Sequence, residues 1–251
     1  RERSRRPENI IADAKELIAA GYKDITLLGQ NVNSYGKDLD CDVDFSDLLR
    51  MLNDLPGDFL IRFMTSHPKD AGEKLFKAMA ECDKVAKHLH LPFQAGNDRV
   101  LKVMNRHYTQ ESYLALVDRA RELMPDIVLT SDVIVGFPGE TDEEFEDTIK
   151  VIERVRFDAL FTFIYSPRKG TPAAEMPDSA TREEKQRRFN RLVDVQNAIS
   201  AEKHASYNGT VQRVLVDGHS EDENYPLTAR TNGGRLVHLK GGESLLGNFA
   251  D

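Results

Sequence analysis

The sequence has 251 residues, of which 40% are apolar and 30% charged, an ordinary globular composition that excludes a disordered or fibrous chain. No apolar run reaches the roughly 18 residues that a membrane-spanning helix needs, so we expect no membrane partner. The net charge of −8 argues against a protein that coats nucleic acid, although it allows local basic patches.

The cysteine content is low. Cys41 and Cys82 are far apart in the sequence, which excludes both a CxxC metal knuckle within the chain and a disulfide framework. This usage is typical of a reducing compartment, and we predict a cytoplasmic protein. The chain opens at Arg1 with no initiator methionine and no apolar signal core, so we expect a fragment of a longer protein.

Helices and strands are expected to alternate from residue 8 to about residue 165. Apolar periodicity and capping residues predict helices over residues 8–20, 45–55, 71–80, 110–123 and 141–155, the last with a capping box of Thr141 and Glu144. Short apolar runs bounded by turn residues predict strands over residues 24–29, 59–64, 85–91, 127–135 and 159–164. This alternation indicates parallel βα units, which both an open Rossmann-type sheet and a TIM-like barrel satisfy.

A polar loop follows each expected strand. These loops comprise residues 29–31, 65–68, 92–96, 136–140 and 165–168. Glycine, proline and asparagine in such loops often serve only to make turns. Parallel α/β folds, however, gather their functional loops at the carboxyl ends of the strands, so five polar loops in series favour one working face.

The last third of the chain differs in character. A helix expected from Thr181 to about Lys203 carries five cations in ten residues, which indicates either a solvated helix face or a strip that contacts phosphates. Strands expected over 210–216, 227–231 and 235–239, with an Asn232-Gly233-Gly234 turn, then predict a small β-barrel. We therefore divide the chain into a barrel (1–175), a connecting basic helix (176–203) and a small β-barrel (204–251).

Common catalytic motifs are absent from the sequence. It contains no GxSxG, P-loop, HExxH or GxGxxG pattern. His88 and His90 would share one strand face, but two histidines alone seldom form a metal site, and we predict none.

The remaining polar residues suit a small molecule with an amino-acid end. The amides of Gln30, Asn31 and Gln94 offer donors and acceptors. Arg106 offers a planar cationic fork for a carboxylate. Asp132 lies inside an apolar strand, where a carboxylate needs a partner such as a ribose diol.

Five segments together resemble successive loops of the radical S-adenosylmethionine methylthiotransferases. These segments are residues 27–36, 65–68, 90–109, 131–148 and 163–176. Within the first, GQNVNSYG (29–36) resembles the branch that methylthiolates C2 of N6-isopentenyladenosine next to the tRNA anticodon. The final 48 residues (204–251) resemble the RNA-binding TRAM domain. The resemblance implies an α/β fold: a partial TIM-like (βα)6 radical SAM barrel that lacks its first strand, plus a small C-terminal β-barrel.

The family resemblance also implies the cofactors. They are S-adenosylmethionine and two [4Fe–4S] clusters, one of which is held by a CxxxCxxC motif and cleaves S-adenosylmethionine to a 5′-deoxyadenosyl radical. The segment Arg1–Glu8 resembles the stretch that directly follows this motif in the family. We therefore expect the cluster ligands to lie upstream of residue 1 and this chain alone to be inactive.

Site residues follow from the same resemblance. Residues expected to bind S-adenosylmethionine are Gln30, Asn31, Ser66, Gln94, Arg106, Asp132 and Tyr165. Residues expected to contact the RNA backbone are Arg3, Arg5, Arg6, Arg168, Lys169, Arg187, Arg188, Arg213, Arg230 and Arg235. The expected partners are tRNA and an electron donor that reduces the cluster, and the expected oligomeric state is a monomer.

Two alternatives remain open from the sequence. One is a sister methylthiotransferase that acts on threonylcarbamoyladenosine in tRNA or on an aspartate of a ribosomal protein. The other is a non-catalytic RNA-binding protein, built from an inert barrel and a TRAM tail.

Overall fold

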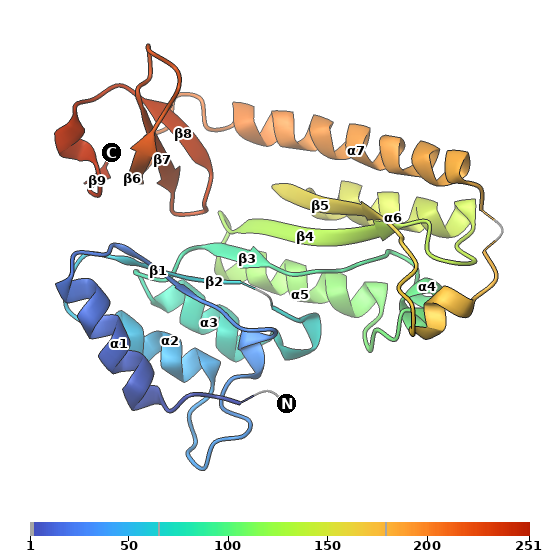
Figure 1. Cartoon of the computed structure of the whole chain (residues 1–251), viewed down its shortest axis with the longest axis horizontal. Helices are drawn as coiled ribbons and strands as arrows, with labels where there is room; N and C mark the ends of the chain where they lie inside the picture. Colours follow the sequence, from blue (N-terminus) through green and yellow to red (C-terminus); the bar gives the residue numbers. More distant parts are fainter. Residues whose placement is uncertain (1–2, 65, 179) are drawn as a thin grey trace.

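The computed structural model describes residues 3–64, 66–178 and 180–251 (Figure 1). Arg1 and Glu2 of the opening segment, Thr65 of the polar loop 65–68 and Ser179 before the basic helix lie outside the described residues. None of the described helices combines the length and the apolar character needed to cross a membrane.

The first two thirds of the chain alternate strands and helices, as predicted. The helices are α1 (Pro7–Ala19), α2 (Phe45–Asn53), α3 (Glu73–Glu81), α4 (Asp98–Val103), α5 (Gln110–Leu123) and α6 (Asp142–Val155). The strands are β1 (Asp24–Leu27), β2 (Leu60–Phe63), β3 (His88–His90), β4 (Val128–Val135) and β5 (Ala159–Ile164). The capping box predicted for α6 is confirmed, because Thr141 accepts from the Glu144 amide and Glu144 accepts in return from the Thr141 amide.

The strands form one parallel sheet in chain order. β1 pairs with β2, β4 lies between β3 and β5, and a parallel bridge between Ile61 and Val85 joins the two groups. A Rossmann-type sheet reverses its strand order at a switch point, whereas a TIM-like barrel keeps the chain order. The observed order β1-β2-β3-β4-β5 therefore decides between the two predicted architectures in favour of a partial barrel.

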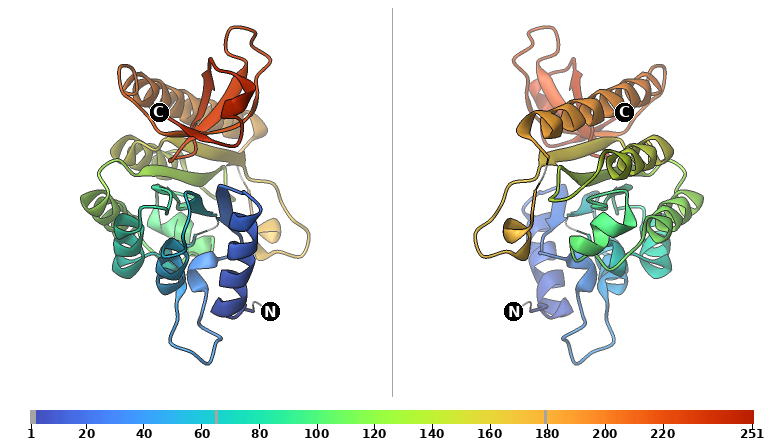
Figure 2. Two further views of the ribbon diagram at one scale, coloured as in Figure 1. Left: turned by 90° about the vertical axis from the view of Figure 1, so that its left-hand side faces the viewer. Right: turned by 90° about the vertical axis from the view of Figure 1, so that its right-hand side faces the viewer.

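The hydrophobic core lies between this sheet and the helices on its outer side (Figure 2). Phe93 stacks on Phe157 with ring centroids 5.4 Å apart, and the fully buried Tyr113 packs beside Phe93. The Tyr113 hydroxyl donates to the carbonyl of Leu91 at 2.8 Å, which satisfies the one polar group of this cluster. The other face of the sheet, turned away from the helices, is the concave face of the partial barrel.

The C-terminal part consists of a long helix and a small antiparallel sheet. Helix α7 (Arg182–Ala205) leads to β6 (Val214–His219), β7 (Leu227–Thr231), β8 (Leu236–Leu239) and β9 (Phe249–Ala250), in the order β8-β7-β6-β9. The prediction of a strand over 210–216 was wrong at both ends. At the start, the Thr210 amide donates to the Tyr207 carbonyl in a turn, and the strand begins only at Val214. At the end, β6 continues past Val216 through a bulge between Val216 and Gly218 and reaches His219.

The β7–β8 hairpin docks the small sheet onto the amino ends of the barrel strands. Arg62 in β2 donates to the carbonyls of Thr231 and Asn232 at 3.1 and 2.7 Å, and the Asn232 side chain accepts from the Lys87 amide at 2.7 Å. Gly233 lies directly against Val128, where an added Cβ would come within 2.3 Å of a methyl group. Only glycine allows this close backbone approach.

Candidate cofactor site

The polar loops at the carboxyl ends of the strands meet along one edge of the sheet. Asn31, after β1, donates to Asp70, after β2, at 2.6 Å. His67 of the same loop packs edge-on against Tyr108 with centroids 6.0 Å apart, and the Tyr108 hydroxyl donates to the Phe93 carbonyl at 3.1 Å. These contacts link the first three loops into one continuous surface.

The remaining loops extend that surface. The backbone of Gln94 pairs with β4, donating to the Asp132 carbonyl and accepting from the Ile134 amide, both at 2.9 Å. After β4 and β5, Phe137 and Tyr165 pack edge to face with centroids 5.1 Å apart. We call this edge, formed by the loops after β1 to β5, the carboxyl rim. The five polar loops thus lie along one edge of the sheet in the described residues, as the parallel topology predicts.

Three of the residues expected to bind the cofactor have buried polar atoms that lack a partner among the described residues. These atoms are Oδ1 of Asn31, Oγ of Ser66 and the hydroxyl oxygen of Tyr165. A buried polar group without a hydrogen bond costs about 1–3 kcal/mol. Because all three belong to rim loops, a polar ligand seated on the rim would recover this free energy.

Gln94 adds a strained backbone to the rim. Its φ of +66° lies in the left-handed region, which a residue with a Cβ occupies at a cost of about 1–2 kcal/mol. The side chain is 7% exposed, and its amide makes no hydrogen bond to another described residue. Backbone strain combined with a free amide is typical of a ligand-binding position.

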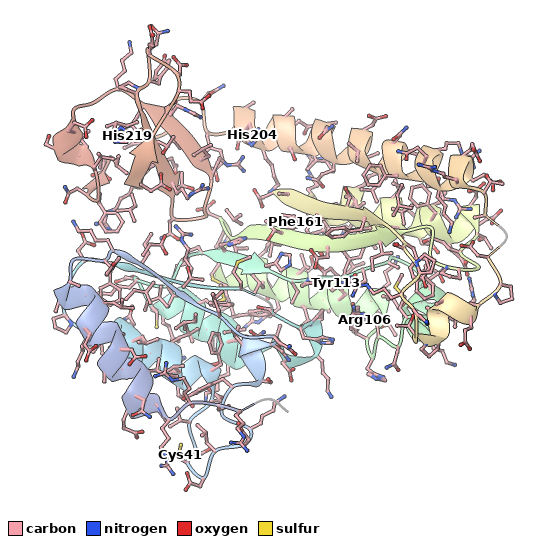
Figure 3. All side chains as sticks on the ribbon, in the orientation of Figure 1. Cys41, Arg106, Tyr113, Phe161, His204 and His219 are labelled. Atoms are coloured by element: carbon pink, nitrogen blue, oxygen red, sulfur yellow. The ribbon has the colours of Figure 1, made fainter. Side chains whose placement is uncertain are left out.

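Arg106 supplies an available cation near the rim (Figure 3). It is half-buried and forms no ion pair with another described residue. Burial, and then the positive charge of Arg106, lower the pKa of His67, which keeps that imidazole neutral at physiological pH. Gln30, by contrast, is exposed to solvent.

Asp132 projects from β4 on the concave face. Its carboxylate is 30% exposed and lies 3.5 Å from Nε2 of His90. The Thr130 hydroxyl bridges the rings of His90 and His88 at 3.0 and 2.9 Å. Burial, reinforced by the charge of Arg62, lowers the pKa of His88 to about 4, so this ring is neutral at pH 7.

The described residues contain no group of three or more histidine, cysteine or acidic side chains able to hold a metal ion. Cys41 is exposed, and Cys82 is buried in the core, where desolvation raises the pKa of its thiol. A [4Fe–4S] cluster therefore has no ligand set among these residues.

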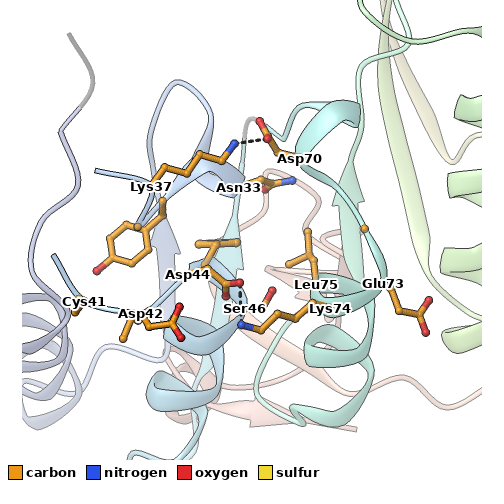
Figure 4. Close-up of a pocket in the computed structure, with 15 residues that line it drawn as sticks. Asn33, Lys37, Cys41, Asp42, Asp44, Ser46, Asp70, Glu73, Lys74 and Leu75 are labelled. Carbon is orange, nitrogen blue, oxygen red and sulfur yellow. Dashed lines mark hydrogen bonds and ion pairs between the residues drawn. The ribbon is translucent and has the colours of Figure 1, made fainter. Parts of the chain in front are cut away.

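Asn33 is a further candidate site residue, which the sequence did not single out. It is 8% exposed, and neither polar atom of its amide has a partner among the described residues. It lines a cavity of about 500 Å³ beside the rim, together with Lys37, Asp70 and Lys74 (Figure 4). Lys37 is paired with Asp70, and Lys74 lies 2.8 Å from Asp44. The repeated asparagine of the GQNVNSYG segment is the signal that could have identified this position.

Five of the ten cations expected to contact RNA are exposed and paired with acidic side chains. Arg5 pairs with Asp13, Arg6 with Asp40, Arg187 with Asp142, Arg213 with Asp58 and Arg230 with Asp217. Arg3, Arg168 and Lys169 are also exposed. Surface pairs of this kind are weak and exchange readily for a phosphate.

Arg188 and Arg235 have a different environment. The Arg188 side chain is 7% exposed and donates to Asp142 and to the Glu140 carbonyl at 2.8 and 3.0 Å. Arg235 is 16% exposed, stacks over Tyr207 and lies 3.4 Å from the buried Asp158. Both arginines thus hold elements of the fold together through hydrogen bonds and ion pairs. A phosphate would have to break those contacts to reach them.

Two family models match the chain. Residues 1–152 match the Radical SAM superfamily and residues 205–251 match the TRAM domain. The first match covers more than half of the sequence, and the chain belongs to the radical SAM superfamily. The resemblance found in the rim loops and in the tail is thereby confirmed.

Individual relatives are more specific. The chain is 55% identical over all 251 residues to the tRNA-2-methylthio-N(6)-dimethylallyladenosine synthase of Thermoanaerobacter sp. (strain X514), and covers 53% of it. It is 50% identical, again over its full length, to the enzyme of that name from Clostridium botulinum (strain Langeland / NCTC 10281 / Type F), and covers 56% of it. The chain thus spans about half the length of the curated relatives that it matches.

A solved structure supports the fold. The radical S-adenosylmethionine methyltransferase TsrM from Kitasatospora setae, solved with cobalamin and a [4Fe–4S] cluster, superposes with a TM-score of 0.54 at 17% identity. The match covers 68% of this chain and 33% of that protein. At this identity the likeness establishes the radical SAM fold alone.

Proposed function

We propose that the chain is the catalytic barrel and RNA-binding tail of a tRNA methylthiotransferase, which adds a methylthio group to C2 of N6-isopentenyladenosine beside the anticodon. The main support is the 55% identity, over all 251 residues of this chain, to a protein named tRNA-2-methylthio-N(6)-dimethylallyladenosine synthase. The GQNVNSYG segment, which first suggested this branch, belongs to the rim and to the adjoining cavity.

The rim residues fit S-adenosylmethionine. Asn31, Ser66 and Tyr165 have buried polar atoms that a ligand would satisfy. The buried amide of Gln94 makes no hydrogen bond to another described residue. Arg106 has the charge to hold the methionyl carboxylate, and Asp132 has the acceptor oxygens for ribose hydroxyls. When bound beside a reduced cluster, this cofactor would supply radical chemistry for hydrogen removal at C2 of the base, and the rim residues would hold and orient it.

The two [4Fe–4S] clusters are proposed for the longer enzyme, with ligands outside this chain. The described residues offer no cluster ligand set, so the role of this chain is to bind and orient the cofactor and the RNA. Exposed cations that are paired only at the surface, such as Arg187 and Arg213, are the proposed phosphate contacts. We also propose a cytoplasmic monomer that receives electrons from an external donor, in keeping with the cysteine usage.

The proposed reaction is tested with the full-length enzyme, reconstituted anaerobically. It is expected to bind two clusters and to methylthiolate C2 in tRNA that contains N6-isopentenyladenosine, as measured by iron content and nucleoside mass spectrometry. A ribosomal protein and a threonylcarbamoyladenosine tRNA serve as competing substrates. Modification of either in place of the isopentenylated tRNA would assign the enzyme to a sister branch, and modification of no substrate would favour a non-catalytic RNA-binding protein.

The cofactor site is tested by binding. Arg106→Ala and Asp132→Ala in the full-length enzyme are each expected to weaken S-adenosylmethionine binding by about 10-fold or more, because each removes a charged hydrogen-bonding group. The matched controls are Arg119→Ala and Asp118→Ala, which remove exposed surface charges on α5 that pair with Glu73 and Arg154. Equal affinity in the rim and control variants, measured by calorimetry, would show that the site is misplaced.

A further inference from the structure

Strand β5 presents two large aromatic side chains on the concave face. Phe161 and Phe163 are 51% and 53% exposed. Leu160, the residue before Phe161, lies on the opposite face and packs against the main core. Side chains alternate along a strand, so Tyr165 follows on the same face as Phe161 and Phe163. We call Phe161, Phe163 and Tyr165 the β5 aromatic strip.

The strip connects the concave face to the rim. Its three residues span about 13 Å at the usual rise of a strand. At the rim end, Tyr165 has a buried hydroxyl without a partner among the described residues and packs on Phe137. A flat ligand on Phe161 and Phe163 would therefore lie next to whatever occupies the cofactor site.

Polar groups border one side of the strip. Asp132 is in register with Phe161 on the neighbouring strand, and the His90 ring lies 5.7 Å from the Phe161 ring. The Asp132 carboxylate is 30% exposed, with His90 Nε2 at 3.5 Å. An apolar surface with an acceptor at its edge suits a heteroaromatic ring that carries an N–H donor, because the ring stacks and the N–H is satisfied.

We propose that Phe161 and Phe163 of the β5 aromatic strip hold the target adenine and its apolar N6 substituent, and so select the alkylated base, while Tyr165 borders the cofactor. The inference rests on the proposed function, which supplies an adenosine with a five-carbon alkyl group. The target base belongs to a single-stranded loop, so it can leave its neighbours and stack on protein aromatics at low cost. A carboxylate has two acceptor oxygens, so one oxygen of Asp132 would accept from the N6–H while the other faces the cofactor ribose. The alkyl group would cover a phenylalanine ring that solvent otherwise contacts.

An apolar segment from the rest of the longer protein is the competing occupant. Such a segment would cover the phenylalanines but would also bury the Asp132 carboxylate, whose one ion-pair partner among the described residues is a histidine at 3.5 Å. An alkylated purine would stack on the phenylalanine rings and also donate a hydrogen bond to the Asp132 carboxylate, and for that reason it is the occupant we favour.

The test uses the full-length enzyme and two anticodon stem-loop RNAs of one sequence, with either adenosine or N6-dimethylallyladenosine at the target position. The wild-type enzyme is expected to bind the alkylated RNA more tightly. Phe161→Ala and Phe163→Ala should each reduce this preference by about 10-fold, since they remove the surface against which the alkyl group packs. Affinity for the unmodified RNA should fall less, because that RNA loses only the stacking of its adenine and phosphate contacts dominate its binding. Affinity for S-adenosylmethionine should stay unchanged.

Controls separate this inference from folding and from the reaction itself. Tyr22→Ala removes a 60% exposed aromatic before β1, at the opposite end of the strands, and should keep the preference. Phe163→Leu keeps an apolar side chain of similar volume and should lose less of the preference than Phe163→Ala.

Three results would overturn the inference. They are an undiminished preference in both alanine variants, an equal loss of affinity for both RNAs, and a loss in Tyr22→Ala as large as in the phenylalanine variants. If the wild-type enzyme modifies the alkylated RNA while one of these holds, only the role of the strip fails. If the wild-type enzyme modifies neither RNA, the proposed function fails as well.

Discussion

Arg62 makes two of the hydrogen bonds that dock the small sheet onto the barrel. Its guanidinium donates to the carbonyls of Thr231 and Asn232, and its Nε donates to Asp24 at 2.7 Å. The side chain is 13% exposed, so water replaces these bonds poorly if they break. Arg62→Met keeps most of the apolar stem and removes all of these donors.

The expected cost is large for a single contact. Two charge-assisted bonds to the hairpin at about 1.5 kcal/mol each give about 3 kcal/mol of lost docking free energy. This corresponds to roughly a 100-fold increase in the undocked population. The matched control is Arg213→Met, which removes a second arginine between the same two parts. Arg213 is 51% exposed and paired with the exposed Asp58, so its loss should cost less than about 1 kcal/mol.

Hydrogen exchange of the Lys87 amide measures this opening directly, because that amide donates to the Asn232 side chain at 2.7 Å. Exchange should accelerate about 100-fold in Arg62→Met and by less than about 10-fold in Arg213→Met. The Ile134 amide, bonded within the barrel to Gln94, reports whether the barrel itself has loosened. Equal Lys87 exchange rates in the two variants would refute the assignment of docking energy to Arg62.

Two further predictions concern stability. Burial raises the pKa of Glu140 from 4.5 to about 7, although the Gly136 amide and Arg188 favour its ionised form. The folded state therefore binds this proton more tightly than the unfolded chain, and the resulting stabilisation is complete below about pH 4.5 and is lost as the pH rises through about 7. The free energy of unfolding, measured with urea, should fall by up to about 3 kcal/mol from pH 5 to pH 8 in the wild type, and Glu140→Gln should remove this fall. An equal fall in wild type and variant would contradict a raised pKa. Thr181 caps α7, because its hydroxyl accepts a hydrogen bond from the Glu184 amide. Thr181→Ala should lower the free energy of unfolding by about 1 kcal/mol, whereas Thr181→Asn should retain it. Equal stability of the two variants would show that the cap contributes nothing.

Local patterns predicted the elements of the barrel well. The bounds of α5 and β5 agree with the sequence prediction, because apolar periodicity and turn residues record which face of an element is buried. The choice between an open sheet and a barrel depended on strand order, which is a non-local property. Helix α4 escaped prediction because it has six residues, too few for a periodicity to show.

The candidate site was predicted in part. The order of rim loops along the chain brought Asn31, Ser66 and Tyr165 to one edge, as parallel topology requires. Some of their polar atoms lack a partner among the described residues, Phe161 is exposed and Arg188 is buried. These properties result from packing between distant segments, which residue type alone does not encode. An arginine in a basic run and an arginine in a buried ion pair are therefore indistinguishable until the fold is known.

The β7–β8 hairpin is attached at the amino ends of the strands, whereas the rim lies at their carboxyl ends. Strand β4, with eight residues, separates these two ends by about 26 Å. A free nucleoside is too short to touch both, so any affinity contributed by the tail is available only to a polymer that extends along the whole barrel. Truncating the RNA stepwise from its stem should therefore abolish the contribution of the tail abruptly, at the length where the molecule no longer reaches from one end to the other.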